Sequence, residues 1–129
     1  MGATTSADLT GAAVAIREFA HAPYSHFQVG AAVLTDSGEV FTGCNVENAS
    51  YGLTICAERA AVCAAVSAGH KKLLAIAVAT AGGHAPCGAC RQVLSEFGPS
   101  MEILLVDADD PSQVRTTSLD KLLPEQFVL

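Results

Sequence analysis

Residues 73–80 read Leu-Leu-Ala-Ile-Ala-Val-Ala-Thr, an unbroken apolar run with the length of one strand. Such a run is typical of a strand that is covered on both faces. Helical segments lie on either side: residues 54–68 are alanine-rich and end before Gly69, and residues 87–97 end before Gly98-Pro99. A buried strand between two helices predicts an α/β protein.

The segments farther from this strand continue the alternation. Two apolar segments before it are joined by Asp36-Ser37-Gly38-Glu39, which has the chemistry of a hairpin turn and predicts an antiparallel pair. We predict helices at residues 8–20 and 118–123, the latter capped by Ser118, and strands at residues 27–34, 40–45, 103–106 and 114–117. These elements predict a single domain over residues 1–129, with three layers, α/β/α, around a mixed sheet of about five strands.

The composition restricts the partners that we expect. The chain has 129 residues, a formal net charge of -6 and only 16% charged residues. Because a typical globular protein has about 25% charged residues, we expect part of the surface to be covered in an oligomer. The negative charge disfavours binding to the phosphate backbone of a nucleic acid. Few aromatic side chains are present to stack on a run of bases.

The N-terminal residues and the apolar runs bear on location. Residues 1–6 lack the pattern of a secretory signal, and the apolar runs are too short to span a membrane, which predicts a cytoplasmic protein without a membrane partner. Met1-Gly2 followed by Ser6 matches the loose pattern for myristoylation of Gly2, with a plain disordered start as the alternative.

The strongest chemical signal is a Cys-x-x-Cys pair, Cys87 and Cys90, at the start of a predicted helix. By itself the pair fits a redox centre, half of a zinc site or coincidence. Cys56 also opens a predicted helix, and both helices follow segments that would place their N-termini at one edge of the sheet. Three thiolates without an obvious fourth protein ligand are typical of a catalytic zinc site, whose open position holds water.

The other cysteines and the histidines are weaker candidates for metal ligands. Cys63 follows Cys56 in the same predicted helix, about 10.5 Å farther along its axis, so we expect it to be a core residue. Cys44 is either a ligand or a buried small residue, and His84 is a ligand, a gate or a loop residue. The remaining histidines, which we interpret as loop residues, are His21, His26 and His70.

Glu58 and Arg59 follow Cys56 in the first turn of its predicted helix. If Glu58 is not a ligand, it is placed to exchange protons with the water at the open position; its alternative role is an interaction with the helix dipole. Three thiolates on one zinc ion sum to a net negative charge, which weakens the metal as a Lewis acid. The two helix N-termini would offset this charge, and Arg59 would donate hydrogen bonds to a thiolate unless it forms a surface salt bridge.

Five stretches form a combined pattern that is more specific than any of its parts. They are Pro23-Tyr24-Ser25-x-Phe27-x-Val29-Gly30-Ala31-Ala32, Gly43-Cys44-Asn45-Val46-Glu47-Asn48-Ala49-Ser50-Tyr51, Cys56-Ala57-Glu58-Arg59, Pro86-Cys87-Gly88-Ala89-Cys90-Arg91-Gln92 and Leu122-Leu123-Pro124. In these stretches the sequence resembles the cytidine deaminase family, specifically its short, homotetrameric branch. The resemblance covers nearly the whole chain.

The resemblance implies a zinc-dependent hydrolase. Cys56, Cys87 and Cys90 would bind one zinc ion per chain, and Glu58 would shuttle protons from the attacking water to the base. The implied reaction converts cytidine and 2'-deoxycytidine to uridine and 2'-deoxyuridine with release of ammonia, in pyrimidine salvage. The alternatives are a deaminase of another cytosine compound, such as an aminoacyl-nucleoside antibiotic, and a zinc-stabilised RNA-binding protein without turnover. The stretch at residues 45–51 argues against the first, and the acidic composition argues against the second.

The resemblance also implies how the nucleoside is held. Phe27 would pack on the pyrimidine, with a place in the core of a strand as its alternative role. Asn45 and Glu47 would hydrogen-bond the ribose 3'-hydroxyl. We expect the Glu47 carboxylate to be buried, so that it disfavours substrates with a phosphate near the sugar hydroxyl.

The same family pattern implies a homotetramer with shared active sites. Ala49 and Tyr51 would border the site of a neighbouring subunit. Phe127 would cover a neighbour's base or, as the alternative, anchor the C-terminal tail in the core.

Overall fold

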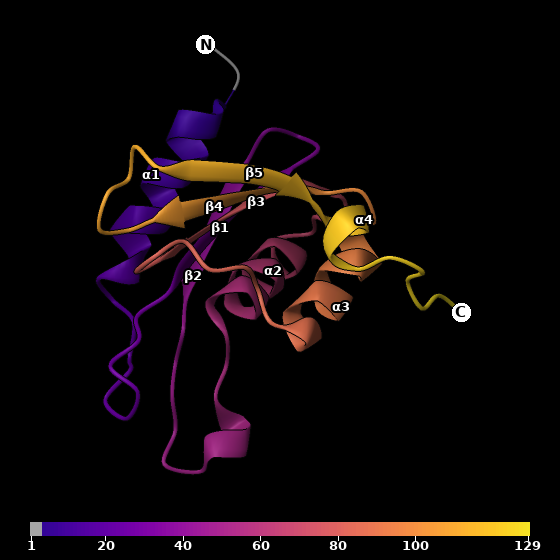
Figure 1. Ribbon diagram of the computed structural model, residues 1–129. Coiled ribbons are helices and arrows are strands. Elements are labelled where there is room, and N and C mark those ends of the chain that lie inside the picture. The colour runs from indigo at the N-terminus through magenta and orange to yellow at the C-terminus, as the bar shows by residue number, and fades with distance from the viewer. Residues whose placement is uncertain (1–3) are drawn as a thin grey trace.

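The computed structural model describes residues 4–129, in which helices flank a sheet (Figure 1). The strands are β1 (Gly30–Thr35), β2 (Val40–Cys44), β3 (Leu73–Thr80), β4 (Glu102–Asp107) and β5 (Val114–Ser118). The helices are α1 (Ser6–Arg17), α2 (Ala57–Ser67), α3 (Gly88–Phe97), α4 (Leu119–Leu122) and the short 3-10 helix η1 (Tyr51–Leu53). Gly2, whose myristoylation the sequence pattern would allow, lies outside the described residues. Within residues 4–129, no helix has the length and apolar character needed to cross a membrane.

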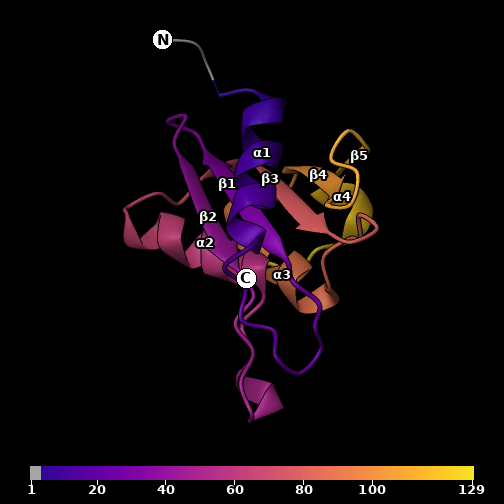
Figure 2. The same ribbon diagram turned by 90° about the vertical axis from the view of Figure 1, so that its left-hand side faces the viewer.

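The strands form one mixed sheet in the order β2-β1-β3-β4-β5. β3 and β4 run parallel, and the other neighbouring pairs are antiparallel. Helix α1 covers one face of the sheet, and α2 and α3 cover the other (Figures 1 and 2). The predicted three-layer α/β/α architecture and its mixed five-stranded sheet are therefore confirmed.

The central strand β3 separates two apolar cores. Ile76 and Val78 belong to the core beneath α2 and α3, whereas Ala75, Ala77 and Ala79 belong to the core beneath α1. Successive side chains of a strand point to opposite faces, so a strand that is buried on both faces has no polar positions. The small alanines allow α1 to approach the sheet closely. This double burial explains the unbroken apolar run.

Two predicted helices differ from the structure at their ends. Helix α1 begins at Ser6 rather than at residue 8, because Thr5 and Asp8 form a capping box across the first turn. It ends at Arg17 rather than at residue 20. Ser118 occupies the N-cap position of α4, but its side chain makes no capping hydrogen bond, so that part of the prediction is wrong.

Tertiary contacts move two further boundaries. Strand β1 begins at Gly30 rather than at residue 27, because the residues before it are bound mainly by the Asn45 side chain, with one further bond from the Asn45 backbone N–H to the Val29 carbonyl oxygen. Helix α2 begins at Ala57 rather than at residue 54, because Ile55 pairs with Val46 through two backbone hydrogen bonds.

Gly43 in β2 brings α2 close to the sheet. A Cβ atom added at this position would lie 2.7 Å from the Ala60 Cβ and 2.8 Å from the Ala57 carbonyl oxygen. Only glycine leaves room for the backbone of α2 at this distance. Because the first turn of α2 also contains Glu58, this contact sets the height of that residue above the sheet.

We expect Gly43→Ala to lower the free energy of unfolding by about 1–3 kcal/mol, since the atoms that meet the new methyl group have to move apart. Gly11→Ala in α1 is the matched control, because no atom lies within 4 Å of an added Cβ there. In this control we expect a gain of up to about 1 kcal/mol from the higher helix propensity of alanine. Urea unfolding followed by circular dichroism measures both variants, and equal stability of the two would contradict the close contact.

Candidate active site

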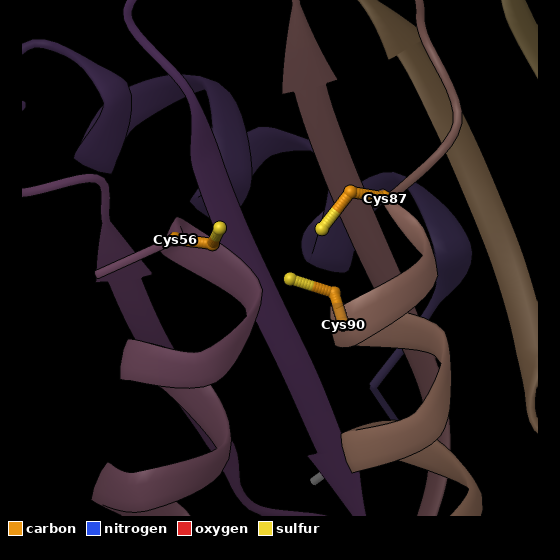
Figure 3. Close-up of side chains that lie close together, drawn as sticks. All are labelled: Cys56, Cys87 and Cys90. Carbon is orange, nitrogen blue, oxygen red and sulfur yellow. The ribbon is translucent and has the colours of Figure 1, made fainter. Parts of the chain in front are cut away.

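Three cysteine sulfurs converge where two helices begin (Figure 3). Cys56 is the N-cap residue of α2, Cys87 is the N-cap residue of α3, and Cys90 lies in the first turn of α3. Their Sγ atoms all lie within 4.8 Å of one another, and no other His, Cys, Asp or Glu in the described part of the chain joins the group. Three sulfur ligands with a free fourth position are the donor set of a catalytic zinc site.

The charges around the sulfurs favour a thiolate at Cys56. A hydrogen bond from the Cys90 thiol, supported by the Arg59 guanidinium and opposed by burial, lowers the pKa of Cys56 to about 5. The shared hydrogen bond with Cys56, together with burial, raises the pKa of Cys90. Zinc is bound by thiolates, so metal binding at this group would release the remaining thiol protons.

Arg59 interacts with one of the three clustered sulfurs, as we expected from the sequence. Its Nη2 donates a hydrogen bond to the Cys56 Sγ at 3.6 Å and a second one to the Thr54 carbonyl oxygen at 3.5 Å. Among residues 4–129, Arg59 makes no salt bridge with a carboxylate, so its alternative role is not observed. A cation at this position offsets part of the negative charge of the thiolates.

Glu58 is a buried carboxyl group near the sulfurs that does not belong to the ligand group. Only 6% of the surface of Glu58 is exposed to solvent. Burial, together with the negative charge at Cys56, raises the pKa of Glu58. A carboxyl group whose pKa is raised in this way exchanges protons at neutral pH more readily than a solvated one.

A cavity of about 300 Å³ opens onto this group of residues. Cys56, Cys87 and Glu58 lie in its wall. The apolar residues of the lining are Phe27, Val29, Ala57, Val78 and Ala85. The other polar residues of the lining are Ser25, Asn45, Glu47, Thr54, Thr80 and His84. Apolar walls with a few placed polar groups are typical of a site for a small molecule.

The sequence profile of the cytidine and deoxycytidylate deaminase zinc-binding region matches residues 5–106 of this chain. The chain belongs to the cytidine deaminase family. The matched residues include all three clustered cysteines and Glu58, and the profile describes a zinc-binding region. The family predicted from the sequence and its zinc cofactor are therefore confirmed.

Relatives in the cytidine deaminase family are similar over nearly the whole chain. The sequence is 53% identical over 123 residues to a cytidine deaminase of Mycobacterium tuberculosis, which covers 94% of this chain and 88% of that protein. A crystal structure of a cytidine deaminase from Burkholderia pseudomallei is 52% identical and has a TM-score of 0.89, covering 95% of this chain and 99% of the other. A crystal structure of a cytidine deaminase from Mycobacterium tuberculosis is 51% identical, with a TM-score of 0.78 and coverage of 94% and 95%.

Phe27 and Asn45 both line the cavity. Phe27 lies before β1 and is 41% exposed, so its alternative role in the core of a strand is wrong. Asn45 is buried, and its amide group is engaged at both ends. Its Nδ2 donates to the Phe27 carbonyl oxygen at 2.8 Å, and its Oδ1 accepts from the Val29 N–H at 2.9 Å. Asn45 therefore holds the segment that presents Phe27 to the cavity.

Glu47 lines the cavity, but the expectation of a buried carboxylate is wrong. Its side chain is half-buried, because it lies at the open side of the cavity next to residues 24 and 25. Its Oε1 accepts hydrogen bonds from the backbone N–H groups of Tyr24 at 3.0 Å and Ser25 at 3.2 Å, and its Oε2 accepts one from the Ser25 hydroxyl. The Ser25 hydroxyl is the main reason that the pKa of Glu47 is lowered.

The residues predicted to act between subunits are not in the cavity lining of their own chain, although Tyr51 lines an adjoining hollow with Glu47 and Thr54. Ala49 and Tyr51 belong to a projecting loop, residues 46–55, that extends away from the sheet (Figure 1). Tyr51 is 73% exposed and makes an edge-on contact with Tyr24. Phe127 is 68% exposed and lies in a separate hollow with Gln92 and Pro99. Its alternative role as a core anchor is therefore wrong.

The prediction that Cys63 is a core residue is also wrong. Cys63 is exposed on α2, because the buried face of this helix is formed by Ala61, Val62 and Ala65. Cys44 is partly buried at the end of β2 and does not join the sulfur group. His84 lines the cavity without joining that group.

Two residues that position the site were not singled out from the sequence. The Ser25 hydroxyl donates to Glu47 and accepts a hydrogen bond from the Phe27 N–H at 3.0 Å, so it links the Glu47 carboxylate to the backbone of Phe27. Arg91 donates to the Pro86 and Leu122 carbonyl oxygens, both at 2.8 Å, and so ties the segment before Cys87 to α4. Both residues lie inside the quoted motifs, but each has one bonding partner that is distant in sequence, Glu47 for Ser25 and Leu122 for Arg91.

Proposed function

We propose that this member of the cytidine deaminase family converts cytidine and 2'-deoxycytidine to uridine and 2'-deoxyuridine, with release of ammonia, in pyrimidine salvage. The observation that carries the proposal is a buried carboxyl group, Glu58, beside three convergent sulfurs in the wall of one cavity. This combination supports hydrolysis at a cytosine ring. Relatives that share about half of the sequence are cytidine deaminases, which supports the same reaction.

Protons are moved by Glu58 in the proposed mechanism. Zinc, when bound by Cys56, Cys87 and Cys90, supplies a Lewis acid that activates water and stabilises negative charge on its oxygen. Glu58 accepts one proton from the attacking water and donates it to N3 of the base. It then transfers the second water proton to the amino group at C4, which leaves as ammonia. The water oxygen becomes the carbonyl oxygen of the product.

The other cavity residues orient the nucleoside. Phe27 packs on the pyrimidine ring, and its position is held by Asn45 and Ser25. Asn45 and Glu47 bind the ribose 3'-hydroxyl on the side of the cavity away from the sulfurs. A carboxylate at this point disfavours a phosphate group close to the 3'-hydroxyl, because like charges repel.

An assay with purified protein tests this function. We expect loss of cytidine absorbance and release of one equivalent of ammonia with cytidine and with 2'-deoxycytidine. Cytidine monophosphate and free cytosine serve as comparison substrates, and both should react much more slowly. Turnover of the monophosphate alone, or of none of these compounds, would contradict the proposed substrate class.

We expect Glu47→Ala to lower kcat/KM for cytidine by roughly 10- to 100-fold, the effect of one hydrogen bond to a charged group. The slow turnover of free cytosine should hardly change, because cytosine has no sugar. Glu102→Gln is the control for a general effect of lost negative charge, because Glu102 is the exposed first residue of β4. Equal losses on cytidine and cytosine would instead show that Glu47 acts by holding the Ser25 and Phe27 segment.

We further propose a homotetramer in which active sites are shared between chains. The projecting loop exposes Tyr51, Leu53 and Ile55, and Phe127 is exposed near the C-terminal end of the sequence. Apolar side chains in such exposed segments favour burial against another chain. In the assembly, Ala49 and Tyr51 border a neighbour's site, and Phe127 covers a neighbour's base.

Mixed tetramers test the sharing of sites. Glu58→Gln chains and chains truncated before Phe127 should each be poorly active as pure tetramers. After refolding together they should regain activity, since roughly one site in four combines an intact Glu58 with an intact Phe127 from its neighbour. Light scattering checks the tetramer. Activity no higher than the average of the two parents would assign Phe127 to its own chain.

The domain organisation and location complete the proposal. A single domain over residues 1–129 is supported by the strands of residues 4–129, which all join one sheet. None of the five cysteines, which all lie within the described residues, forms a disulfide, which supports a location in the reducing cytoplasm. The expected partner is a small nucleoside rather than a nucleic acid, because the chain has a net charge of -6.

A further inference from the structure

His84 lies in the cavity wall, with its side chain partly open to solvent. It belongs to the loop between β3 and α3, three residues before Cys87. Its backbone N–H donates to the Thr80 hydroxyl at 2.7 Å. A Cβ atom added at Gly82 would lie 3.0 Å from the His84 Nε2, so the imidazole packs directly over this glycine. Gly82 of the same loop therefore lies against one side of the imidazole ring.

The other neighbour of the imidazole is Phe27. The centroids of the two rings are 6.1 Å apart, and the ring planes are inclined by 51°. A base stacked between two rings needs about 3.5 Å on each side, or about 7 Å in total. The rings are too close and too inclined for this arrangement. A base that packs on Phe27 consequently meets His84 at its edge and not with its face.

The proposed function, on which this step rests, identifies that edge. In the proposed orientation, C4 of the cytosine ring faces the sulfurs, N3 faces Glu58, and the sugar on N1 extends towards Glu47. Glu58 lies in the first turn of α2, whereas His84 lies in the loop before the start of α3. These two helix starts lie on opposite sides of the sulfur group (Figure 3). The ring atom next to C4 on the side away from N3 is C5.

We infer that His84 is a specificity-determining residue that limits the size of the substituent at C5 of the cytosine ring. The imidazole is exposed to solvent but packs against Gly82 on one side and Phe27 on the other, so a larger base displaces it only with loss of these contacts. Cytidine therefore fits, and nucleosides with a group at C5 are disfavoured.

The test compares cytidine with 5-methylcytidine. We expect His84→Ala to change the ratio of the two kcat/KM values in favour of 5-methylcytidine by on the order of 10-fold, the effect of one methyl group in a tight pocket. His84→Phe keeps a ring of similar width and should keep the preference of the unchanged protein. Inhibition by uridine and 5-methyluridine gives the same comparison without turnover and should change in parallel.

His70→Ala is the control, because His70 packs against Phe41 and does not line the cavity. It should leave both ratios unchanged. Zinc content and melting temperature show that each variant is folded, and a purely structural role of His84 would lower the values for both nucleosides together. The inference would be overturned if the ratio of the two kcat/KM values in His84→Ala stayed within about twofold of the unchanged protein. It would also be overturned if His84→Phe lost the preference for cytidine as fully as His84→Ala. A protein that deaminates neither nucleoside would overturn the proposed function itself.

Discussion

Glu58→Gln is expected to retain zinc and to lose at least about 100-fold, and as much as about 10,000-fold, in kcat with cytidine. Glutamine has nearly the same shape as glutamate but cannot accept and release a proton in the reaction. Since Glu58 lies outside the group of three sulfurs, its replacement leaves the donor set intact. Steady-state kinetics and metal analysis on the same preparation measure the two effects.

Glu102→Gln is the matched control for Glu58→Gln, because Glu102 is exposed on β4 and far from the cavity lining. We expect this control to have full activity and full zinc content. If Glu58→Gln were folded but had lost its zinc, Glu58 would be a ligand and not the proton shuttle. If it kept normal turnover, another group would have to move the protons.

Cys56→Ala, Cys87→Ala and Cys90→Ala should each lose zinc and nearly all activity. A site with three protein ligands holds its metal poorly once one of them is removed. The unchanged protein should contain about one zinc ion per chain. Atomic absorption on dialysed protein, together with the cytidine assay, measures both outcomes. Circular dichroism shows whether the variant chains have folded.

Cys63→Ala and Cys44→Ala are the controls for these variants. Cys63 is exposed on α2, and Cys44 does not join the sulfur group, so both variants should keep metal and activity. Loss of zinc in Cys44→Ala, together with retention in one of the three cluster variants, would show that the ligand set is wrong.

Sequence-based prediction succeeded where a residue's environment depends on its local sequence. The strand at Leu73–Thr80 was predicted with its observed bounds, because burial on both faces requires an apolar residue at nearly every position. The ligand candidates were predicted because Cys56 and Cys87 begin helices, and a residue in a helical first turn is placed by its spacing alone. The position of Glu58 next to the sulfurs follows from the same spacing.

Sequence-based prediction failed where the environment of a residue depends on segments that are distant in the sequence. Cys63 was assigned to the core because it lies too far along the helix from Cys56 to bind the same ion, but which face of an alanine-rich helix is buried depends on how the helix lies on the sheet. The start of β1 was placed three residues early, since residues 27–29 are apolar enough for a strand. Their backbone is instead bound by Asn45, which is 16 residues away from Val29 in the sequence.

Local sequence was sufficient to predict the α/β architecture, the three clustered cysteines and the neighbouring carboxyl group, because strand burial and helical spacing are local properties. Tertiary packing was needed to show that Glu47 is half-buried and bound by Ser25, that Phe127 is exposed, and that His84 lies against Phe27. These contacts join segments that are far apart along the chain. Their energies depend on the packing of the whole sheet and its helices, which no local pattern of residues specifies.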